Sequence, residues 1–554
     1  MQALPFLVYA SVVTLMPALV VLWHHGAAAS WAFIGGDAYL YLGIARNSPP
    51  EFYSFDGERP TNGFHPFWQY WVWLVTDWFR DSPGVVRNIT AWSAILLVWV
   101  GAVLGGLAAR RLSGSWALAC LVTPGAYFLL IGQGVGGLAA WNFFNAMEAG
   151  LTFALAGVIL LLAAQAGRWQ DRALYWLALG VALAALVFAR LDEAFGVLTI
   201  ALALLLWPGR ARGWLRGLRD GLLVGLPAAA MLGLYFAYNH AQMGLFMPIS
   251  GSAKGEGALL SNGWVTALTL FAPMVELREG LTDYTADRAA LRGAAFRVWQ
   301  LFVPAGLAAV LALTLWQRFA DRPWAPILAG ACAGIILKAA YSFLFANYWH
   351  QAHWYFGFAM LTLSVTLAAV TGPALARLWQ VVPGAARGVG VFLVAFGLLH
   401  SSHQSLRAGP EVVPGAERMQ FWTDRAALEA QLRAAEPGIR LLDFGDGILG
   451  YSFDFVVRDG FVFAGDIDSL RALRASRLLR DSHADGFTVL ASFEYLRAPP
   501  EATTWDSDAI RAYLADSHLD ARVKAELELF DFEVIHRDAP TGVVFIRFTP
   551  RAEG

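Results

Sequence analysis

An acidic residue, Asp37, stands shortly after the first apolar stretch of the chain, which ends near residue 23. A segment of mixed apolar and polar residues over 38–47 follows it, as expected for a helix lying along a membrane surface. A carboxylate at the boundary of lipid and water can have a shifted pKa and act as a base, or can bind a divalent cation. A helix-capping role is the simpler alternative, because Gly-Asp before an apolar helix is a common cap.

Further ionisable residues lie inside or beside later apolar stretches. They are Glu148, Arg190, Asp192 and Glu193. Such groups are costly in a membrane, so they usually mark a functional site or a buried pair. The alternative to a functional site is a structural ion pair of Arg190 with Glu148 or with Asp192.

Basic and histidine residues stand in the intervening loops. Lys254 lies in a Gly- and Ser-rich loop, where one ammonium group suits a phosphate or pyrophosphate, although a solvated lysine fits equally well. His65 precedes a proline, and His350 and His353 lie in an aromatic loop. Together with Asp37 these histidines could bind a metal ion or a donor phosphate, but a lone histidine more often fills an interface.

The elements that must position these residues are apolar helices. Of the 554 residues 57% are apolar and 15% are charged, whereas soluble proteins average about 25% charged residues. A span needs about 20 apolar residues, and we expect about 11 spans. The candidates are 4–23, 64–79, 89–109, 115–132, 147–166, 173–190, 193–207, 220–239, 297–315, 324–345, 354–371 and 386–402. The short, aromatic segment 64–79 is expected to be re-entrant or interfacial.

Lysine and arginine residues gather in alternating loops, as the positive-inside rule predicts for cytoplasmic loops. They are Arg110, Arg111, Arg168, Arg172, those of the run 210–219, Arg318, Arg322, Arg377 and Arg387. The opposite loops, and everything after residue 403, are then extracytoplasmic. The chain start has neither a basic residue nor a clear cleavage site, so we expect a retained first span.

From about residue 405 the composition becomes that of a soluble domain. Residues 415–435 predict an amphipathic helix, and charged helical stretches alternate with strand-like runs at 439–443, 461–463, 487–490, 532–535 and 543–548. We therefore expect a transmembrane domain over 1–404, with the outer loop 24–63, and a C-terminal extracytoplasmic α/β domain over 405–554.

Charge and cysteine content exclude other classes. The net charge of −2 gives no indication of a nucleic-acid partner. Cys120 and Cys332 both lie in apolar runs, so neither a disulfide framework nor a zinc site is predicted.

The first outer loop resembles that of the GT-C-fold glycosyltransferases. The runs that match are 37–47, which begins Asp-Ala-Tyr, and 61–68, which reads Thr-Asn-Gly-Phe-His-Pro-Phe-Trp. They are most similar to the bacterial branch of arabinosyl- and mannosyltransferases that use polyprenyl-phosphate sugars. Gly36 stands where many members have a first acidic residue, which leaves Asp37 as the sole acid there and metal dependence open. Further similar runs follow in order at 145–151, 189–194, 246–254, 349–355, 445–452 and 464–469.

The resemblance implies a multi-pass α-helical membrane protein of GT-C-like fold in the bacterial cytoplasmic (inner) membrane. It would move a hexosyl or pentosyl group from a polyprenyl-phosphate donor to a glycan, lipid or protein acceptor of the cell envelope. Asp37 would be the general base of a single inverting displacement. The donor phosphate would be bound by Lys254, Arg190, His65, His353 and Tyr355. The site would be supported by Glu148, Asp192, Glu193, Tyr39 and Asn62. No cofactor is certain, although Mg²⁺ or Mn²⁺ could bind at Asp37.

Two other classes share this composition. A transporter or flippase of lipid-linked saccharides also has many spans and intramembrane charges, but it normally shows internal repeats and broken helices near the bilayer midplane. Here no repeat is visible, and the charges gather near one face. A non-catalytic scaffold for envelope assembly would explain the outer domain but not the charged loops.

Overall fold

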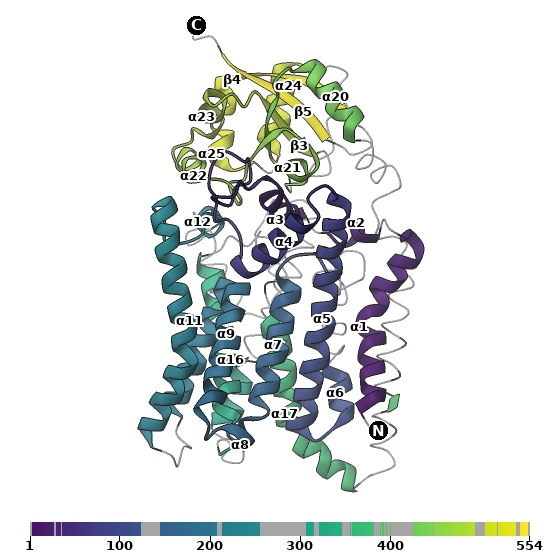
Figure 1. Cartoon of the computed structure of the whole chain (residues 1–554), viewed down its shortest axis with the longest axis vertical. Coiled ribbons are helices and arrows are strands. Elements are labelled where there is room, and N and C mark those ends of the chain that lie inside the picture. The colour runs from purple at the N-terminus through teal and green to yellow at the C-terminus, as the bar shows by residue number, and fades with distance from the viewer. Residues whose placement is uncertain are drawn as a thin grey trace, which may run out of the picture.

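A bundle of long helices carries a smaller α/β domain at one end, and the N-terminus lies at the other end (Figure 1). The computed structural model describes residues 3–26, 29–34, 36–122, 144–207, 213–254, 306–314, 319, 321–345, 355, 357–381, 388, 391–392, 395, 399, 425–445, 447–493, 505–517, 519–538 and 543–551.

The bundle is built from apolar helices. They are α1 (Ala3–His25), α5 (Pro83–Ser113), α6 (Trp116–Val122), α7 (Ala149–Ala163), α8 (Ala166–Trp169), α9 (Ala173–Ala189), α10 (Ala194–Leu206), α11 (Trp214–Met243), α16 (Ala325–Phe345) and α17 (Gly357–Val381). Helices α5 and α7 pack closely, because a Cβ on Gly150 would lie 2.4 Å from the carbonyl oxygen of Ala94. Small residues of this kind let helix backbones approach in a membrane.

Among the described residues, three helices are long and apolar enough to cross a membrane: α5, α11 and Gly357–Arg377 of α17. The bent α1 makes a fourth if its two halves form one span, and α7, α9 and Ala325–Tyr341 are shorter apolar helices. The expectation of about 11 spans stays a prediction. Most of the candidate segments 297–315 and 386–402 falls outside the described residues.

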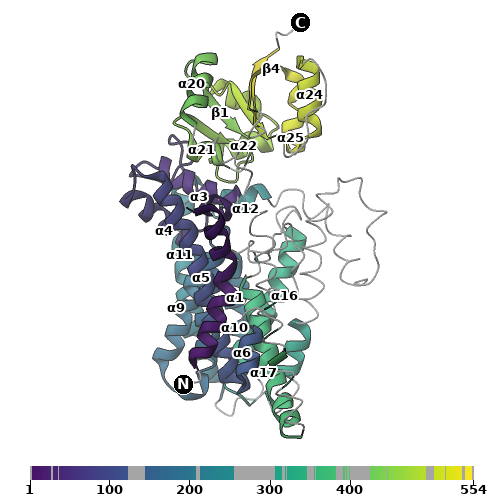
Figure 2. The ribbon, with the colours of Figure 1, turned by 90° about the vertical axis from the view of Figure 1, so that its right-hand side faces the viewer.

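A layer of short helices lies between the bundle and the C-terminal domain (Figure 2). It contains α2 (Ala29–Phe33), α3 (Gly36–Asn47), α4 (Pro66–Trp78) and α12 (Ile249–Lys254). Helix α4 has 13 residues, hence a length of about 20 Å, which is too short for a hydrocarbon core of about 30 Å. This length agrees with the interfacial character expected for 64–79.

The C-terminal region forms a small mixed sheet. Its strands are β1 (Arg440–Asp443), β2 (Val456–Asp459), β3 (Val489–Phe493), β4 (Phe530–Asp538) and β5 (Val543–Pro550). The order is β2-β1-β3-β5-β4, in which β1 pairs in parallel with β2 and β3, whereas β5 is antiparallel to β3 and β4. Helices pack around it: α20 (Arg425–Ala435), α21 (Ile448–Ser452), α22 (Ile467–Arg474), α23 (Leu478–Ala484), α24 (Ser507–Asp516) and α25 (Ala521–Lys524).

The strand predicted at 461–463 is wrong. These residues form a turn after β2, because the Asp459 carboxylate accepts hydrogen bonds from the backbone N–H groups of Phe461 and Ala464. The local aromatic pattern favours a strand, but a side chain that binds the backbone a few residues onward favours a turn.

The C-terminal domain rests on α3 and on the loop that follows it. Tyr451 lies with its ring 5.9 Å from that of Tyr39, and its hydroxyl donates to the carbonyl oxygen of Pro83 at 2.6 Å. Asn47 donates to the carbonyl oxygen of Gly450 at 3.1 Å, and Arg440 makes two hydrogen bonds to Glu58. Segments about 400 positions apart in the sequence therefore form one interface.

Gly63→Ala should weaken this interface, because a Cβ at that position would lie 1.8 Å from the carbonyl oxygen of Phe463. Backbone must move to admit it, and we expect a destabilisation of about 1–3 kcal/mol. Hydrogen exchange should show faster exchange in 447–466, across the interface. Gly251→Ala is the matched control, since a Cβ there meets no atom within 4 Å. Equal exchange in both variants would contradict the contact.

Candidate active site

Charged side chains form a buried cluster beneath α3. Arg190 donates from Nη1 to Glu148 Oε1 at 2.5 Å, and its Nε lies 3.0 Å from Asp192 Oδ1. Lys338 Nζ lies 2.5 Å from Glu193 Oε1 and 3.2 Å from Asp192 Oδ2. All but Asp192 are at most 4% exposed. Burial of this extent requires that the charges be paired, and each of them is.

A break between two helices brings the acidic and basic groups together. Helix α9 ends at Ala189, and Arg190 is extended, with φ −158° and ψ 108°. A short 3-10 turn, Leu191–Glu193, then leads into α10. The break therefore turns Arg190, Asp192 and Glu193 towards α7 and α16.

The upper side of the cluster meets the interfacial layer. The Tyr41 hydroxyl donates to Glu148 Oε2 at 2.9 Å, and His65 Nε2 lies 3.7 Å from Glu148 Oε1. Burial and the neighbouring Glu148 carboxylate raise the pKa of Tyr41 well above its usual value, so the phenol stays protonated and donates. Tyr355 closes another side: its ring lies 3.9 Å from the Arg190 guanidinium carbon, and its carbonyl oxygen accepts from Lys338 at 2.6 Å.

Asp37 lies one helical turn from this cluster. It is the second residue of α3 and precedes Tyr41 by four positions, so the two side chains share one face of the helix, with Cβ atoms about 5–6 Å apart. Asp37 is half-buried. Within the described part of the chain its carboxylate makes no hydrogen bond or ion pair. Its carboxylate is therefore available to bind a substrate group.

The other expected site residues lie in different places. Tyr39 is buried and faces Tyr451 of the C-terminal domain, so it supports the interface rather than the cluster. Asn62 accepts a hydrogen bond from the backbone N–H of Ile249 at 2.9 Å and so holds the start of α12, the helix that ends at Lys254. The Lys254 side chain and the whole of His353 fall outside the described residues.

Sequence reasoning missed two members of the cluster, Lys338 and Tyr41. Lys338 stands alone in the apolar candidate span 324–345, and the rule that singled out Arg190 applies to it equally. Tyr41 follows Asp37 at helical spacing. The ion pairs expected as an alternative to function are both present, since Arg190 contacts Glu148 and Asp192 together.

Divalent-cation binding remains a prediction. In the part of the chain that the structure describes, no three His, Cys, Asp or Glu side chains are grouped so that they could hold a metal ion.

A second carboxyl, Asp459 of the C-terminal domain, lies near enough to Asp37 to interact with it. Burial, and to a smaller extent the Asp37 charge, raise the pKa of Asp459 to about 6, although hydrogen bonds from backbone N–H groups act in the opposite sense. The folded protein therefore holds this proton more tightly than the unfolded chain, in which an Asp titrates near pH 3.9.

The stability of the C-terminal domain should therefore fall as the pH rises from about 4 to about 6. The Asp459 contribution should be about 3 kcal/mol. Asp459→Asn should remove this part of the dependence of the free energy of unfolding on pH, because an amide does not ionise. Unfolding at a series of pH values measures it. Asp454→Asn, at an exposed carboxyl of the same interface, should keep the wild-type slope. An unchanged slope in Asp459→Asn would count against the assignment.

Comparison with known proteins identifies the fold. The sequence matches no protein-family model and no curated protein. Among solved structures, the Archaeoglobus fulgidus oligosaccharyltransferase tethered to an acceptor peptide aligns with 100% of this chain and 74% of its own, at a TM-score of 0.51 and 12% identity. That enzyme is a GT-C-fold glycosyltransferase. The chain has a GT-C-like fold.

Two structures of ArnT from Cupriavidus metallidurans are also similar to this chain. The apo form aligns with 95% of this chain and 97% of its own, at 15% identity and a TM-score of 0.49. The form bound to undecaprenyl phosphate aligns with 95% and 98%, at 14% identity and a TM-score of 0.42. The GT-C-like assignment rests on the oligosaccharyltransferase alone. Because the identity is only 12%, this similarity shows the fold and not the substrate. The arabinosyl- and mannosyltransferase branch therefore remains a prediction.

Proposed function

We propose that the protein is a membrane glycosyltransferase that moves a sugar from a polyprenyl-phosphate donor to an acceptor hydroxyl with inversion. The observation that carries the proposal is the position of Asp37. In a chain with a GT-C-like fold, this half-buried carboxylate has no ion-pair partner among the described residues. It lies one turn from the buried chain formed by Tyr41, Glu148 and Arg190.

The reaction needs one base and one anion-binding region. Asp37 takes the proton of the acceptor hydroxyl, and the oxygen forms a bond to the anomeric carbon of the donor. The bond from that carbon to the phosphate oxygen breaks, and the phosphate leaves with the electron pair. One displacement inverts the anomeric centre. No acid is obligatory, since phosphate departs readily at neutral pH, which suits a single essential carboxylate.

The charge of the cluster bears on how the phosphate is held. Three carboxylates face only two cations, Arg190 and Lys338, so the cluster by itself does not attract an anion. We therefore assign the phosphate to Lys254, to His65 in its charged form and to the aromatic loop of His353 and Tyr355, with Arg190 contributing from below. Glu148, Asp192 and Glu193 keep the two buried cations in position.

Charge bias supports an outer-face site. Helix α5 has 31 residues, a length of about 46 Å, and begins where Tyr451 of the C-terminal domain binds Pro83. It ends with Arg110 and Arg111 at the opposite end of the bundle (Figure 1). By the positive-inside rule, these arginines support a cytoplasmic end of α5 and an extracytoplasmic C-terminal domain, and the membrane we propose is the bacterial inner membrane.

Transfer from a labelled donor tests the proposal. The full chain in proteoliposomes is given polyprenyl-phosphate hexoses and pentoses carrying a radiolabel, together with glycan, lipid and peptide acceptors. We expect label in one acceptor class and an equal amount of free polyprenyl phosphate. Uncleaved donor crossing the vesicle membrane, without transfer, would instead identify a flippase and overturn the proposal.

A further inference from the structure

The first turn of α4 contacts both partners of the hydrogen bond between Tyr41 and Glu148. His65, Trp68 and Gln69 stand three and four positions apart, and the backbone N–H of Gln69 donates to the carbonyl oxygen of His65 at 3.1 Å. At this spacing the three side chains share one face of the helix. That face lies against α3 on one side and against the segment leading into α7 on the other.

Trp68 supports the segment that carries Glu148. Its side chain is 1% exposed, and its indole Nε1 donates to the carbonyl oxygen of Ala146 at 3.0 Å. Ala146 is itself buried and has a φ of 60°, in the left-handed region that residues other than glycine rarely adopt. Such a conformation is strained and persists only where the surrounding contacts hold it. The bond from Trp68 is one of these contacts, and Asn145, whose side-chain oxygen accepts from the backbone N–H two residues on, supplies another.

Gln69 supports the helix that carries Asp37. Its side chain is fully buried, and its Nε2 donates to the carbonyl oxygen of Tyr41 at 3.1 Å. Tyr41 is therefore bound through its backbone by Gln69 and through its hydroxyl by Glu148. Because Asp37 lies one turn earlier on the same face of α3, these two bonds fix the place of the proposed base relative to the buried cluster.

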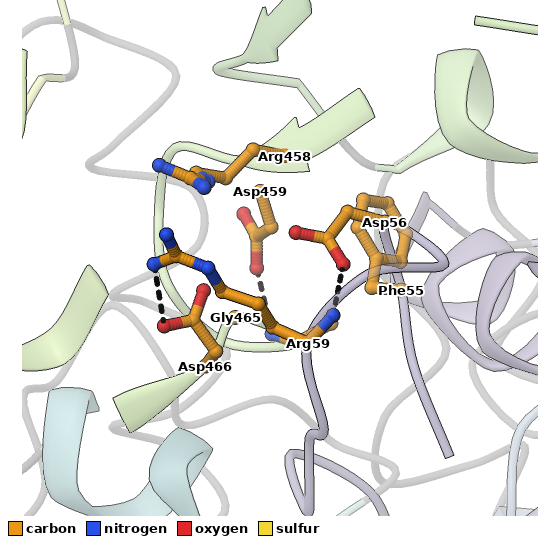
Figure 3. Close-up of a pocket in the computed structure, with 8 residues that line it drawn as sticks. Phe55, Asp56, Arg59, Arg458, Asp459, Gly465 and Asp466 are labelled. Carbon is orange, nitrogen blue, oxygen red and sulfur yellow. Dashed lines mark hydrogen bonds and ion pairs between the residues drawn. The ribbon is translucent and has the colours of Figure 1, made fainter. Parts of the chain in front are cut away.

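The loop that follows α3 is held separately, by the C-terminal domain. Figure 3 shows Arg59 of this loop beside Asp466, at 3.6 Å, and the Asp56 carboxylate accepting from the backbone N–H of Arg59 at 2.9 Å. These contacts lie beyond the C-terminal end of α3, whereas the hydrogen bonds made by Gln69 and Glu148 act on its second turn. The contacts of α4 can therefore be altered without changing those of the domain.

We propose that Trp68 and Gln69 are positioning residues of the transferase, which fix Asp37 relative to Glu148 and the buried cluster. This inference rests on the proposed function. A general base must lie within hydrogen-bonding distance of the proton it takes, and a displacement of about 1 Å can lower a rate about 100-fold. Both side chains are buried, so each acts through a partner: Trp68 acts through Glu148, and Gln69 acts through the backbone of Tyr41.

Steady-state transfer kinetics in proteoliposomes test the role with Trp68→Phe, which removes the indole N–H and keeps an aromatic ring. We expect kcat to fall about 10- to 100-fold. The KM values of donor and acceptor should change less than about twofold, because a displaced base weakens the transition state and not the binding of the substrates. Gln69→Met, a variant of similar size without the hydrogen bond, should lower kcat about tenfold in the same way.

Trp176→Phe is the matched control. Trp176 is also buried, and its Nε1 donates to a backbone carbonyl oxygen, that of Gln170, at 2.9 Å. It stands near the start of α9, about 20 Å along that helix from Arg190. The substitution removes the same kind of hydrogen bond away from the site, so kcat should stay at the wild-type value. An equal fall of kcat in Trp176→Phe would overturn the positioning role.

Ala146→Gly provides a second-site test. Glycine adopts a φ near +60° without strain, so the segment should keep its conformation after the bond from Trp68 is lost. We expect Trp68→Phe/Ala146→Gly to recover most of the lost kcat. Gln69→Met/Ala146→Gly should recover none, because Gln69 acts on α3. Rescue of both double variants, or of neither, would contradict the proposal. If Trp68→Phe does not fold, an unchanged kcat in Gln69→Met would be enough to reject it.

Hydrogen exchange in nanodiscs separates this proposal from the proposed function, because it needs no transfer activity. The amides of 147–152 should exchange faster in Trp68→Phe and at the wild-type rate in Trp68→Phe/Ala146→Gly. That pattern in a protein without transfer activity would reject the transferase and keep the support of Glu148 by Trp68. Transfer that is as fast in Trp68→Phe and Gln69→Met as in the wild type would reject the positioning role and keep the transferase.

Discussion

Asp37→Asn is expected to lower the rate of sugar transfer by about 10²–10⁴-fold, the usual contribution of a general base. The amide keeps the shape of the side chain but cannot take the acceptor proton. Since Asp37 makes no hydrogen bond or ion pair with another described residue, the substitution should leave folding intact. The rate is measured in proteoliposomes under single-turnover conditions with a saturating donor, and the unfolding temperature is measured in parallel.

Asp81→Asn is the control for this experiment. Asp81 is an exposed acid between α4 and α5, in the same part of the molecule, and its substitution should change the rate less than twofold. Full turnover by Asp37→Asn would refute the role of Asp37 as base. A loss that follows a fall in the unfolding temperature would assign Asp37 to structure instead.

Lys338→Met is expected to destabilise the protein by about 3–5 kcal/mol, because it leaves a buried carboxylate without its cation. Glu193 is 2% exposed and loses a contact of 2.5 Å, whereas Asp192 keeps its contact with Arg190 at 3.0 Å. Tyr355 also loses the hydrogen bond to its carbonyl oxygen. Chemical unfolding in detergent micelles measures the change in the free energy of unfolding.

The double variant Lys338→Met/Glu193→Gln should recover most of that loss, since neutralising both partners removes the unpaired charge. Lys524→Met, the same substitution in a half-exposed helix of the C-terminal domain, should cost less than about 1 kcal/mol. If Lys338→Met were as stable as Lys524→Met, the buried pair would have no structural role. If the double variant were no better than the single one, the hydrogen bond to Tyr355 would account for the effect.

The buried ion pairs form one network. Arg190 and Lys338 share Asp192, so a substitution at one cation should change the ion pairing of the other. Residues within one ion-pair network are rarely additive. The kinetic effects of Glu148, Arg190 and Lys338 variants should therefore be compared in double-mutant cycles rather than summed.

Several features of the fold and of the site could be predicted from the local sequence alone. An apolar run of about 20 residues can be stable in a bilayer as a helix, so a helical membrane protein follows from composition. A charge in such a run is costly wherever it lies, which marked Glu148, Arg190, Asp192 and Glu193 before any partner was known. Strands β1, β3, β4 and β5 also followed from their local patterns.

Which group meets which was decided only by the tertiary structure. Glu148, Arg190 and Lys338 come from the start of α7, the end of α9 and α16, and nothing in the sequence pairs Lys338 with the acids near Arg190. The hydrogen bonds of Asn47 with Gly450 and of Tyr451 with Pro83 likewise join segments that are far apart in the sequence. The sequence determined the energetic cost of each buried charge, because that cost depends on the local surroundings; the partner that offsets it was set by helix packing, which brings distant positions within hydrogen-bonding distance.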